Sequence, residues 1–449
     1  MRSGERFAQA SALCGSLVCG RDVLDSKVKW TVVGLALVTV VVLGALMVQR
    51  AAFSTNLNSD FLTYRAAGQA VLNGSDIYEV SNSRGWPYAY PPPFAILMTP
   101  FAKMSALTGS IVWFLLSMCL VVSAAHLCVT MVRGLGPFRG NPFWWYVLSF
   151  VPVLPWVGQA AVEGQATILM WWLLSLALYL SQRGKDIFSG TALACAGLLK
   201  IFPLALLAYF AWKRRWRLMM ATITALLVGG LVLPALVYGW EQNITYWLGW
   251  VAAVTQPFIG VGGSQPESKI DNRVLGPSNP RNQALNAVLW RLGAKEQARF
   301  TTAAIGLAAA LAMFMAARRA RPEQDLVIAA AWLAWIIVIV PVSHFHYHVL
   351  ALLPMTVLAY LALVKTDPFL TTTARGALII YVMATTSTLA FTSMQYVGLL
   401  CWTTVGLWAA LVFFVIRRAS HPAAAHDYEF SETNRRGNCM TKKAANLKL

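Results

Sequence analysis

Apolar segments about as long as a bilayer is thick follow one another along this chain. A helix needs roughly 20 apolar residues to cross the hydrocarbon core of a membrane. Only helices and closed barrels satisfy their backbone polar groups in lipid, so the sequence predicts an all-α polytopic membrane protein. We expect spans near 29–49, 107–132, 143–157, 166–181, 217–237, 301–317, 325–342, 347–364, 375–393 and 397–416.

One further apolar segment, 188–212, is too long for a single simple helix, and LysIlePhePro at 200–203 interrupts it. Because proline removes a backbone donor and breaks helices, we predict two half-helices that form a short re-entrant hairpin at Lys200. With this hairpin, the expected total is about 11 to 12 transmembrane helices.

Composition agrees with a membrane protein, because 58% of the residues are hydrophobic and 12% are charged. The 36 Lys and Arg exceed the 18 Asp and Glu, which gives a net charge of +18. In a soluble protein this excess would suggest a nucleic-acid partner. Here the basic residues mostly form short runs between apolar segments, so we expect positive-inside topology and no nucleic acid. The seven scattered cysteines predict no disulfide framework.

The basic runs orient the chain. If the chain starts inside, the spans and the hairpin together place every run on the cytoplasmic side. We therefore predict a multi-pass protein of the cell (plasma) membrane with both termini cytoplasmic. Residues 1–27 are expected to be a cytoplasmic leader, 28–418 the membrane domain and 419–449 a disordered cytoplasmic tail. The runs are at 133–139, 183–185, 213–217, 318–321 and 417–418.

The outer face then holds large loops at about 50–105 and 238–300. Asp60 lies a few residues beyond the first span, and Asp60, Tyr64, Ala67 and Val71 repeat at helical spacing. A carboxylate at this level is placed for chemistry on a lipid headgroup. The ordinary alternative is a solvated loop aspartate.

The order of residues around Asp60 resembles the start of glycosyltransferase family 87. These are polyprenyl-phosphate-sugar-dependent enzymes of the GT-C superfamily, and they include the mannosyltransferases of phosphatidylinositol mannoside synthesis. The resemblance implies a GT-C-like fold with its active site in extracytoplasmic loops, and Asp60 as the catalytic carboxylate. It is carried by Asp60, Tyr64, Ala66, Ala67, Leu72, Gly74, Tyr78, the TyrProPro at 90–92 and Pro100.

Later motifs extend the resemblance over about 58–355. GlnAlaThrIleLeu from Gln165 and LysIlePhePro from Lys200 look like family motifs, as does the ArgAsnGln that begins at Arg281. Ala284 replaces the usual serine there, and Arg291 aligns with a family arginine. The resemblance implies substrate contacts at Asn282 and Gln283 and a phosphate or acceptor contact at the arginines.

Lys200 is the sharpest of these candidates. An intramembrane lysine costs about 2.5 to 3.5 kcal/mol to insert, so it is rarely kept without a partner. One reading is a cation for the donor phosphate, since broken helices line cavities; the other is a lysine that snorkels to the interface. Glu163 and Gln165, in the outer turn at 158–165, either bind substrate or begin a solvated helix.

Three histidines occur in SerHisPheHisTyrHis at 343–348. Pro341 and Ser343 match the family, His344 stands where Trp is usual, and His346 takes the position of the first family histidine. Any of His344, His346 and His348 can therefore be the one that binds donor phosphate or acceptor. Zinc binding and interfacial packing are the alternatives, and zinc lacks neighbouring acidic or cysteine ligands in the sequence.

We predict an inverting glycosyltransferase in which Asp60, as general base, takes the proton from the acceptor hydroxyl. Lys200, His346 and Arg291 would stabilise the departing lipid phosphate. Tyr64 and Tyr90 are expected to stack on sugar. The partners are membrane lipids, a polyprenyl-phosphate hexose, most plausibly mannose, and a lipid or glycan acceptor.

No cofactor is expected, and a divalent metal is left open. A multi-pass transporter or lipid flippase is the alternative, because a broken helix with a buried lysine also suits a substrate pathway.

Overall fold

The computed structural model describes residues 26–54, 59–82, 85, 87–135, 142–259, 276–320, 324–363 and 368–420. Within these ranges every regular element is a helix, and one isolated bridge pairs Ser81 with Pro87. The predicted all-α polytopic fold is confirmed. The expected leader at 1–27 and tail at 419–449 lie almost entirely outside the described residues.

Six of the described helices are long and apolar enough to cross a membrane. A seventh span results if the bent pair α6 (Pro142–Phe150) and α7 (Leu154–Glu163) counts as one, with an angle of 72° between its halves. Pro152 and Pro155 lie at this bend, where proline disfavours a continuous helix. The six are Ser26–Phe53, α5 (Ala106–Arg133), Trp216–Tyr238, α16 (Gln297–Arg319), Phe345–Leu363 and Leu399–Arg417.

Two features explain why the expected total of about 11 to 12 is higher. Helix α19 (Pro368–Ala390), at the expected span 375–393, has 23 residues but is not apolar enough to count as a span, and other helices are too short. Four further apolar helices have only 10–17 residues. The 16 residues of α8, for example, rise about 24 Å, less than the roughly 30 Å of a hydrocarbon core. The four are α8 (Thr167–Gln182), α9 (Asp186–Leu199), the pair η2 and α10 (Phe202–Trp212), and α17 (Asp325–Ile339).

The predicted hairpin at Lys200 is present. Helix α9 ends at Leu199, Lys200 is extended with φ −148° and ψ 132°, and η2 (Phe202–Ala205) leads into α10 (Leu206–Trp212). Arg215, just after α10, forms an ion pair with Asp186 at the start of α9 and donates from Nη2 to the Ser181 carbonyl at 3.0 Å. The two half-helices therefore begin and end at the same end of the bundle.

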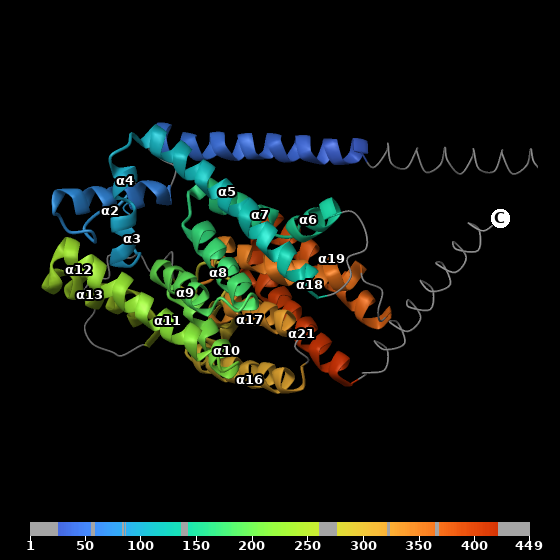
Figure 1. The fold of residues 1–449 in the computed structure, drawn as a ribbon. Coiled ribbons are helices and arrows are strands. Elements are labelled where there is room, and N and C mark those ends of the chain that lie inside the picture. The colour runs from blue at the N-terminus through green and yellow to red at the C-terminus, as the bar shows by residue number, and fades with distance from the viewer. Residues whose placement is uncertain are drawn as a thin grey trace, which may run out of the picture.

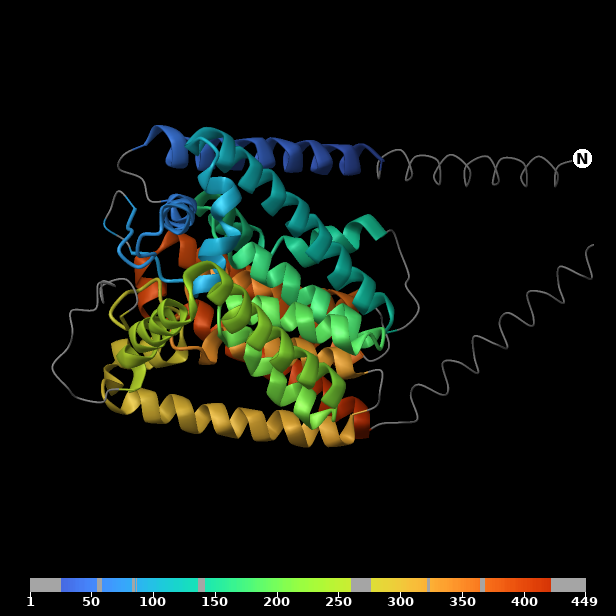
Figure 2. The ribbon, with the colours of Figure 1, turned by 60° about the vertical axis from the view of Figure 1, so that its left-hand side comes forward.

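Other basic turns lie at that end too. Lys213 Nζ is 2.7 Å from Asp325 Oδ2, and the guanidinium of Arg318 lies 5.3 Å from the ring centre of Trp212. Figure 2 shows the first and last described helices reaching this end, on its right-hand side. Thus the alternation predicted from the basic runs is consistent with the arrangement of the helices.

The opposite end carries the segments that were expected on the outer face. Short helices α2 (Asp60–Asn73), α3 (Pro92–Leu97) and α4 (Thr99–Ala102) gather there with α12 (Leu233–Tyr238) and α13 (Trp240–Ile259), at the left of Figure 1. Tyr238 Oη donates to the Pro92 carbonyl at 3.1 Å, which ties α12 to α3. The region 238–300, expected to be a polar loop, is thus helical over its first part.

Two C-terminal segments form the centre of the bundle. Helix α17 and the segment Phe345–Leu363 are almost wholly buried, which fits their largely apolar sequences. The remaining elements are η1 (Gln49–Phe53), α11 (Trp216–Leu227), η3 (Val228–Val232), α15 (Leu285–Leu289), η4 (Trp290–Ala294), η6 (Phe345–Ala351), α18 (Leu352–Leu363), α19 (Pro368–Ala390), α20 (Thr392–Tyr396) and α21 (Leu399–Ser420).

Candidate active site

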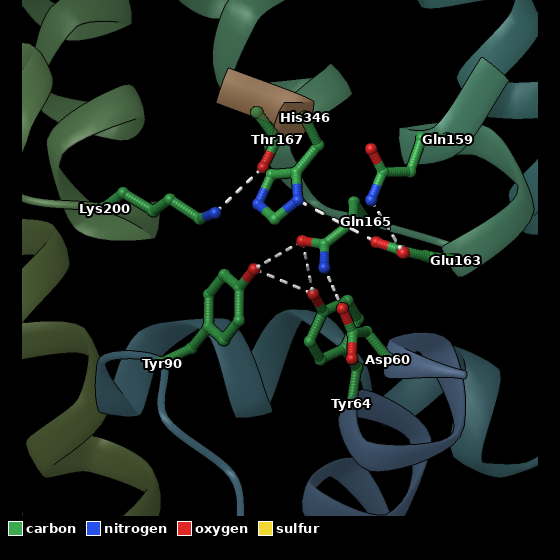
Figure 3. A network of polar contacts seen from close by, with 9 residues as sticks. All are labelled: Asp60, Tyr64, Tyr90, Gln159, Glu163, Gln165, Thr167, Lys200 and His346. Atoms are coloured by element: carbon green, nitrogen blue, oxygen red, sulfur yellow. Dashed lines mark hydrogen bonds and ion pairs between the residues drawn. The ribbon is translucent and has the colours of Figure 1, made fainter. Parts of the chain in front are cut away.

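A chain of hydrogen bonds leads to the carboxylate of Asp60 (Figure 3). Tyr64 Oη donates to Tyr90 Oη at 2.8 Å, and Tyr90 Oη donates to Gln165 Oε1 at 3.3 Å. Gln165 Nε2 in turn donates to Asp60 Oδ2. Since both phenols lie on the carbonyl side of the amide, the Gln165 NH₂ group faces Asp60.

The two tyrosines remain protonated donors. Burial, then the neighbouring Tyr90 phenol and the Asp60 carboxylate, raises the pKa of Tyr64 well above its usual value. Burial and Asp60 raise the pKa of Tyr90 in the same way. Each hydroxyl therefore keeps its proton at neutral pH, and the chain delivers hydrogen bonds toward the carboxylate.

Local structure places both ends of this chain. Asp60 is the first residue of α2, where the helix dipole favours a negative charge. Gln165 follows Gly164, which ends α7 in the left-handed region with φ +70°. A Cβ at Gly164 would lie 2.8 Å from Phe61 Cβ, so glycine is needed for this turn to approach α2. Trp113 Nε1 donates to the Gly164 carbonyl at 3.0 Å and fixes the turn.

Lys200 approaches the same chain from the hairpin. Its Nζ donates to Thr167 Oγ1 at 2.8 Å, at the start of α8. The ammonium also lies 4.3 Å from the ring centre of Tyr347 and 5.5 Å from that of Tyr90. Two aromatic faces and a hydroxyl therefore hold the cation beside the side chains of Asp60, Gln165, Tyr64 and Tyr90, which we call the Asp60 cluster.

Glu163 lies on the other side of Gln165 from Lys200, as Figure 3 shows. Its Oε1 accepts from Gln159 Nε2 at 3.0 Å, and its Oε2 is 3.8 Å from His346 Nδ1. Gln159 and Glu163 are four residues apart on α7, so the helix itself brings them together. Glu163 and His346 thus join the carboxylate, amide and lysine in one cluster.

The three histidines have different surroundings. His344 stacks on His346 with 5.8 Å between ring centres, so both belong to the cluster. Burial, with the charges of Lys200 and Arg281, lowers the pKa of His344 to about 4, which leaves this imidazole neutral at neutral pH. His348 is fully buried, packs on Trp156 and shares a 3.2 Å hydrogen bond with Tyr381 Oη, so it lies in the bundle interior.

Three side chains of the 281–292 motif make their hydrogen bonds outside this cluster. Asn282 Oδ1 accepts from the backbone nitrogen of Ser343 at 3.0 Å, and Gln283 Nε2 donates to the Gln395 carbonyl at 2.8 Å. The Arg291 guanidinium donates to the carbonyls of Tyr396, Pro277 and Asn279, each at 2.9 Å. These three side chains bind backbone, and Asn282 holds the segment that leads into the histidines.

Sequence reasoning missed several members of the cluster. Thr167, Tyr347 and Gln159 bind Lys200 or Glu163. Each lies in a stretch that the sequence singled out, but none of the three was itself named as a site residue. Arg281 lies close enough to Glu163 and His344 to act on both electrostatically. Arg281, rather than Arg291, is therefore the motif arginine nearer the cluster. Among the residues that the structure describes, no three His, Cys, Asp or Glu side chains form a metal-binding group.

Comparisons with known proteins place the chain in a family. The sequence profile of glycosyltransferase family 87 matches residues 88–343, more than half of the chain. The Mycolicibacterium smegmatis polyprenol-phosphate-mannose-dependent alpha-(1-2)-phosphatidylinositol mannoside mannosyltransferase is 26% identical over 331 residues, covering 68% of this chain and 70% of the relative.

Two other proteins are similar at lower sequence identity. The Mycobacterium tuberculosis protein of the same description is 22% identical over 190 residues, covering 40% of this chain and 44% of that protein, so the match spans less than half of the relative. Among solved structures, ArnT from Cupriavidus metallidurans bound to undecaprenyl phosphate aligns over 87% of this chain and 77% of that chain, with 14% identity and a TM-score of 0.37.

Proposed function

Because the chain belongs to glycosyltransferase family 87, we propose that it transfers a sugar from a polyprenyl-phosphate donor to an acceptor hydroxyl, with Asp60 as general base. The observation that carries the proposal is the meeting of Asp60, Lys200 and His346 at the end of the bundle away from the basic turns. A carboxylate and a cation in one cluster suit a reaction in which a proton leaves one reactant and a phosphate leaves the other.

Asp60 takes the proton of the acceptor hydroxyl while that oxygen forms a bond to the anomeric carbon. The bond between the anomeric carbon and the phosphate oxygen breaks, and its electron pair leaves with the lipid phosphate. Lys200 stabilises this charge, since an ammonium held in a water-poor site acts more strongly than in water. Attack opposite the leaving group inverts the anomeric centre.

The same proposal extends to the substrates. Mannose is the donor sugar favoured by the descriptions of the two mycobacterial relatives, and a lipid-linked acceptor is favoured by the same descriptions. A β-linked mannosyl phosphate would then give an α-mannoside. The clustering of basic turns with both described ends of the chain supports cytoplasmic termini and an active site on the outer face.

The proposal is tested by transfer from radiolabelled polyprenyl-phosphate mannose, glucose, galactose and arabinose into lipid acceptors in membranes. We expect wild type to use one donor and Asp60→Asn to lose transfer at equal abundance. Glu79→Gln is the matched control, because it makes the same carboxylate-to-amide change at an exposed site in the same outer loop. Full activity of Asp60→Asn would remove Asp60 as the base. No transfer from any donor by wild type would favour the transporter.

A further inference from the structure

A groove separates the first span, Ser26–Phe53, from α7. Its volume is about 460 Å³, within the range of small-molecule sites. Only 6% of the most apolar window of the first span is buried, so this helix lies at the edge of the bundle and the groove is open to the surrounding lipid. It is lined by Thr39, Leu43, Arg50, Leu154, Pro155, Gly158, Gln159, Val162 and Glu163.

The groove has the length and polarity of one lipid chain. From Thr39 to Arg50 the helix rises about 17 Å, roughly half of a hydrocarbon core and so about one leaflet. The Thr39 hydroxyl donates to the Leu35 carbonyl within its own helix at 2.8 Å. The part of the groove wall formed by Thr39 is therefore effectively apolar. At Gly158 the wall formed by α7 comes close to the first span, since an added Cβ would make an ordinary 3.5 Å contact with Leu43 Cδ2.

Polar side chains gather where the groove meets the candidate active site. Arg50, Gln159 and Glu163 line this end. Glu163 is shared by both sites, since it lies 3.8 Å from His346 and accepts the Gln159 amide. A molecule in the groove therefore has its polar head beside the Asp60 cluster, on the side opposite Lys200 (Figure 3).

We propose that this groove binds the acceptor, a phospholipid-anchored glycan. One alkyl chain lies between the first span and α7, the phosphate pairs with the Arg50 guanidinium, and the sugar reaches Gln159 and Glu163. The assignment rests on the proposed function: if Lys200 takes the donor phosphate, the acceptor approaches Asp60 from the Glu163 side.

Binding can be tested without catalysis. Full-length protein in lipid nanodiscs is irradiated with phosphatidylinositol that carries a diazirine acyl chain, and labelled peptides are identified by mass spectrometry. We expect labelling on both walls, at Leu43 and Leu154. Gly158→Phe and Thr39→Phe fill the groove from opposite walls and lower labelling about tenfold, as the loss of roughly two buried methylenes would.

Matched variants separate the groove from general damage. Val41→Phe adds the same ring at a position on the first span that is 70% exposed, and it leaves labelling unchanged. Gly158→Ala, whose Cβ makes only an ordinary contact, keeps labelling. Arg50→Gln weakens labelling and Arg50→Lys restores part of it, because the charge is retained.

Kinetics then identify the occupant. Thr39→Phe is expected to raise KM for the lipid acceptor about tenfold and to leave KM for the donor unchanged. A raised donor KM, or loss of labelling by added polyprenyl phosphate, would assign the groove to the donor and overturn the proposal. Unchanged labelling in both phenylalanine variants would also overturn it. Labelling that follows the expected pattern without any sugar transfer would refute the proposed function alone.

Discussion

Replacement of Gln165 by leucine tests whether the amide positions Asp60 and keeps its carboxylate ionised. The substitution removes the donor to Asp60 Oδ2 and the acceptor of the Tyr90 hydroxyl, at nearly the same volume. A hydrogen bond to a charged group contributes about 1.5 to 3 kcal/mol. If this hydrogen bond holds Asp60 in its reactive position, its loss in the variant lowers kcat/KM about 10- to 150-fold.

The pH–rate profile distinguishes this role from a structural one. Hydrogen bonding to a carboxylate favours its charged form. Without the amide, the acid limb of kcat/KM against pH should therefore move to higher pH, and a merely weakened fold would not move it. The assay is initial transfer from the labelled donor in nanodiscs over pH 5 to 9, a range of roughly two units on either side of neutral.

Tyr90→Phe is the graded control, since it removes the phenol and leaves the amide donor in place. A neutral hydrogen bond contributes about 0.5 to 1.5 kcal/mol, so its effect on kcat/KM should be about 2- to 13-fold. Equal losses in both variants with no movement of the acid limb would refute the role given to Gln165.

Three other changes have expected outcomes. Lys200→Met should lower kcat by about 100-fold or more while the protein remains inserted, because an electrostatic contact to the leaving phosphate is lost. Single-turnover transfer measures this effect, and a change in KM alone would contradict it. His346→Ala should impair transfer far more than His348→Phe, which should mainly lower thermal stability, and a detergent melting curve separates the two. Gly164→Ala should destabilise the protein by about 1 to 2 kcal/mol or more, because the left-handed turn strains a Cβ, and unchanged melting would exclude that strain.

Much of the fold was predictable because it depends on local hydropathy. The apolar segments, the basic turns and the break at Lys200 and Pro203 are each visible in a window of about 20 residues. The family identification from dispersed motifs is confirmed, and with it the class of membrane glycosyltransferase. The bend between α6 and α7 was not predicted. The sequence indicated a single span at 143–157, which includes α6 and the start of α7, and an outer turn at 158–165, which includes the end of α7.

The candidate site was only partly predictable, because its contacts join distant parts of the chain. Asp60 and Gln165 are separated by 105 residues, and Lys200 and Thr167 by 33. Asp60, Gln165 and Lys200 were each singled out by a motif, yet no sequence feature showed that the Gln165 amide bridges Asp60 to two phenols. Conversely, Arg291 was expected at the donor phosphate, and its guanidinium is instead held by three backbone carbonyls. Its predicted phosphate role is untested.

Helix length gives the site its depth. Helices α8 and α9 run from the basic end to Thr167 and Lys200, and their 16 and 14 residues rise only about 24 and 21 Å. Both are shorter than a hydrocarbon core of roughly 30 Å, so with the basic end at one membrane boundary we expect Lys200 and Thr167 to lie below the opposite boundary. A lysine there is costly unless it has polar or aromatic partners, which Thr167 and Tyr347 supply. A site at this depth suits substrates that arrive from within the bilayer, since a lipid phosphate can then reach the ammonium without its chain leaving the membrane.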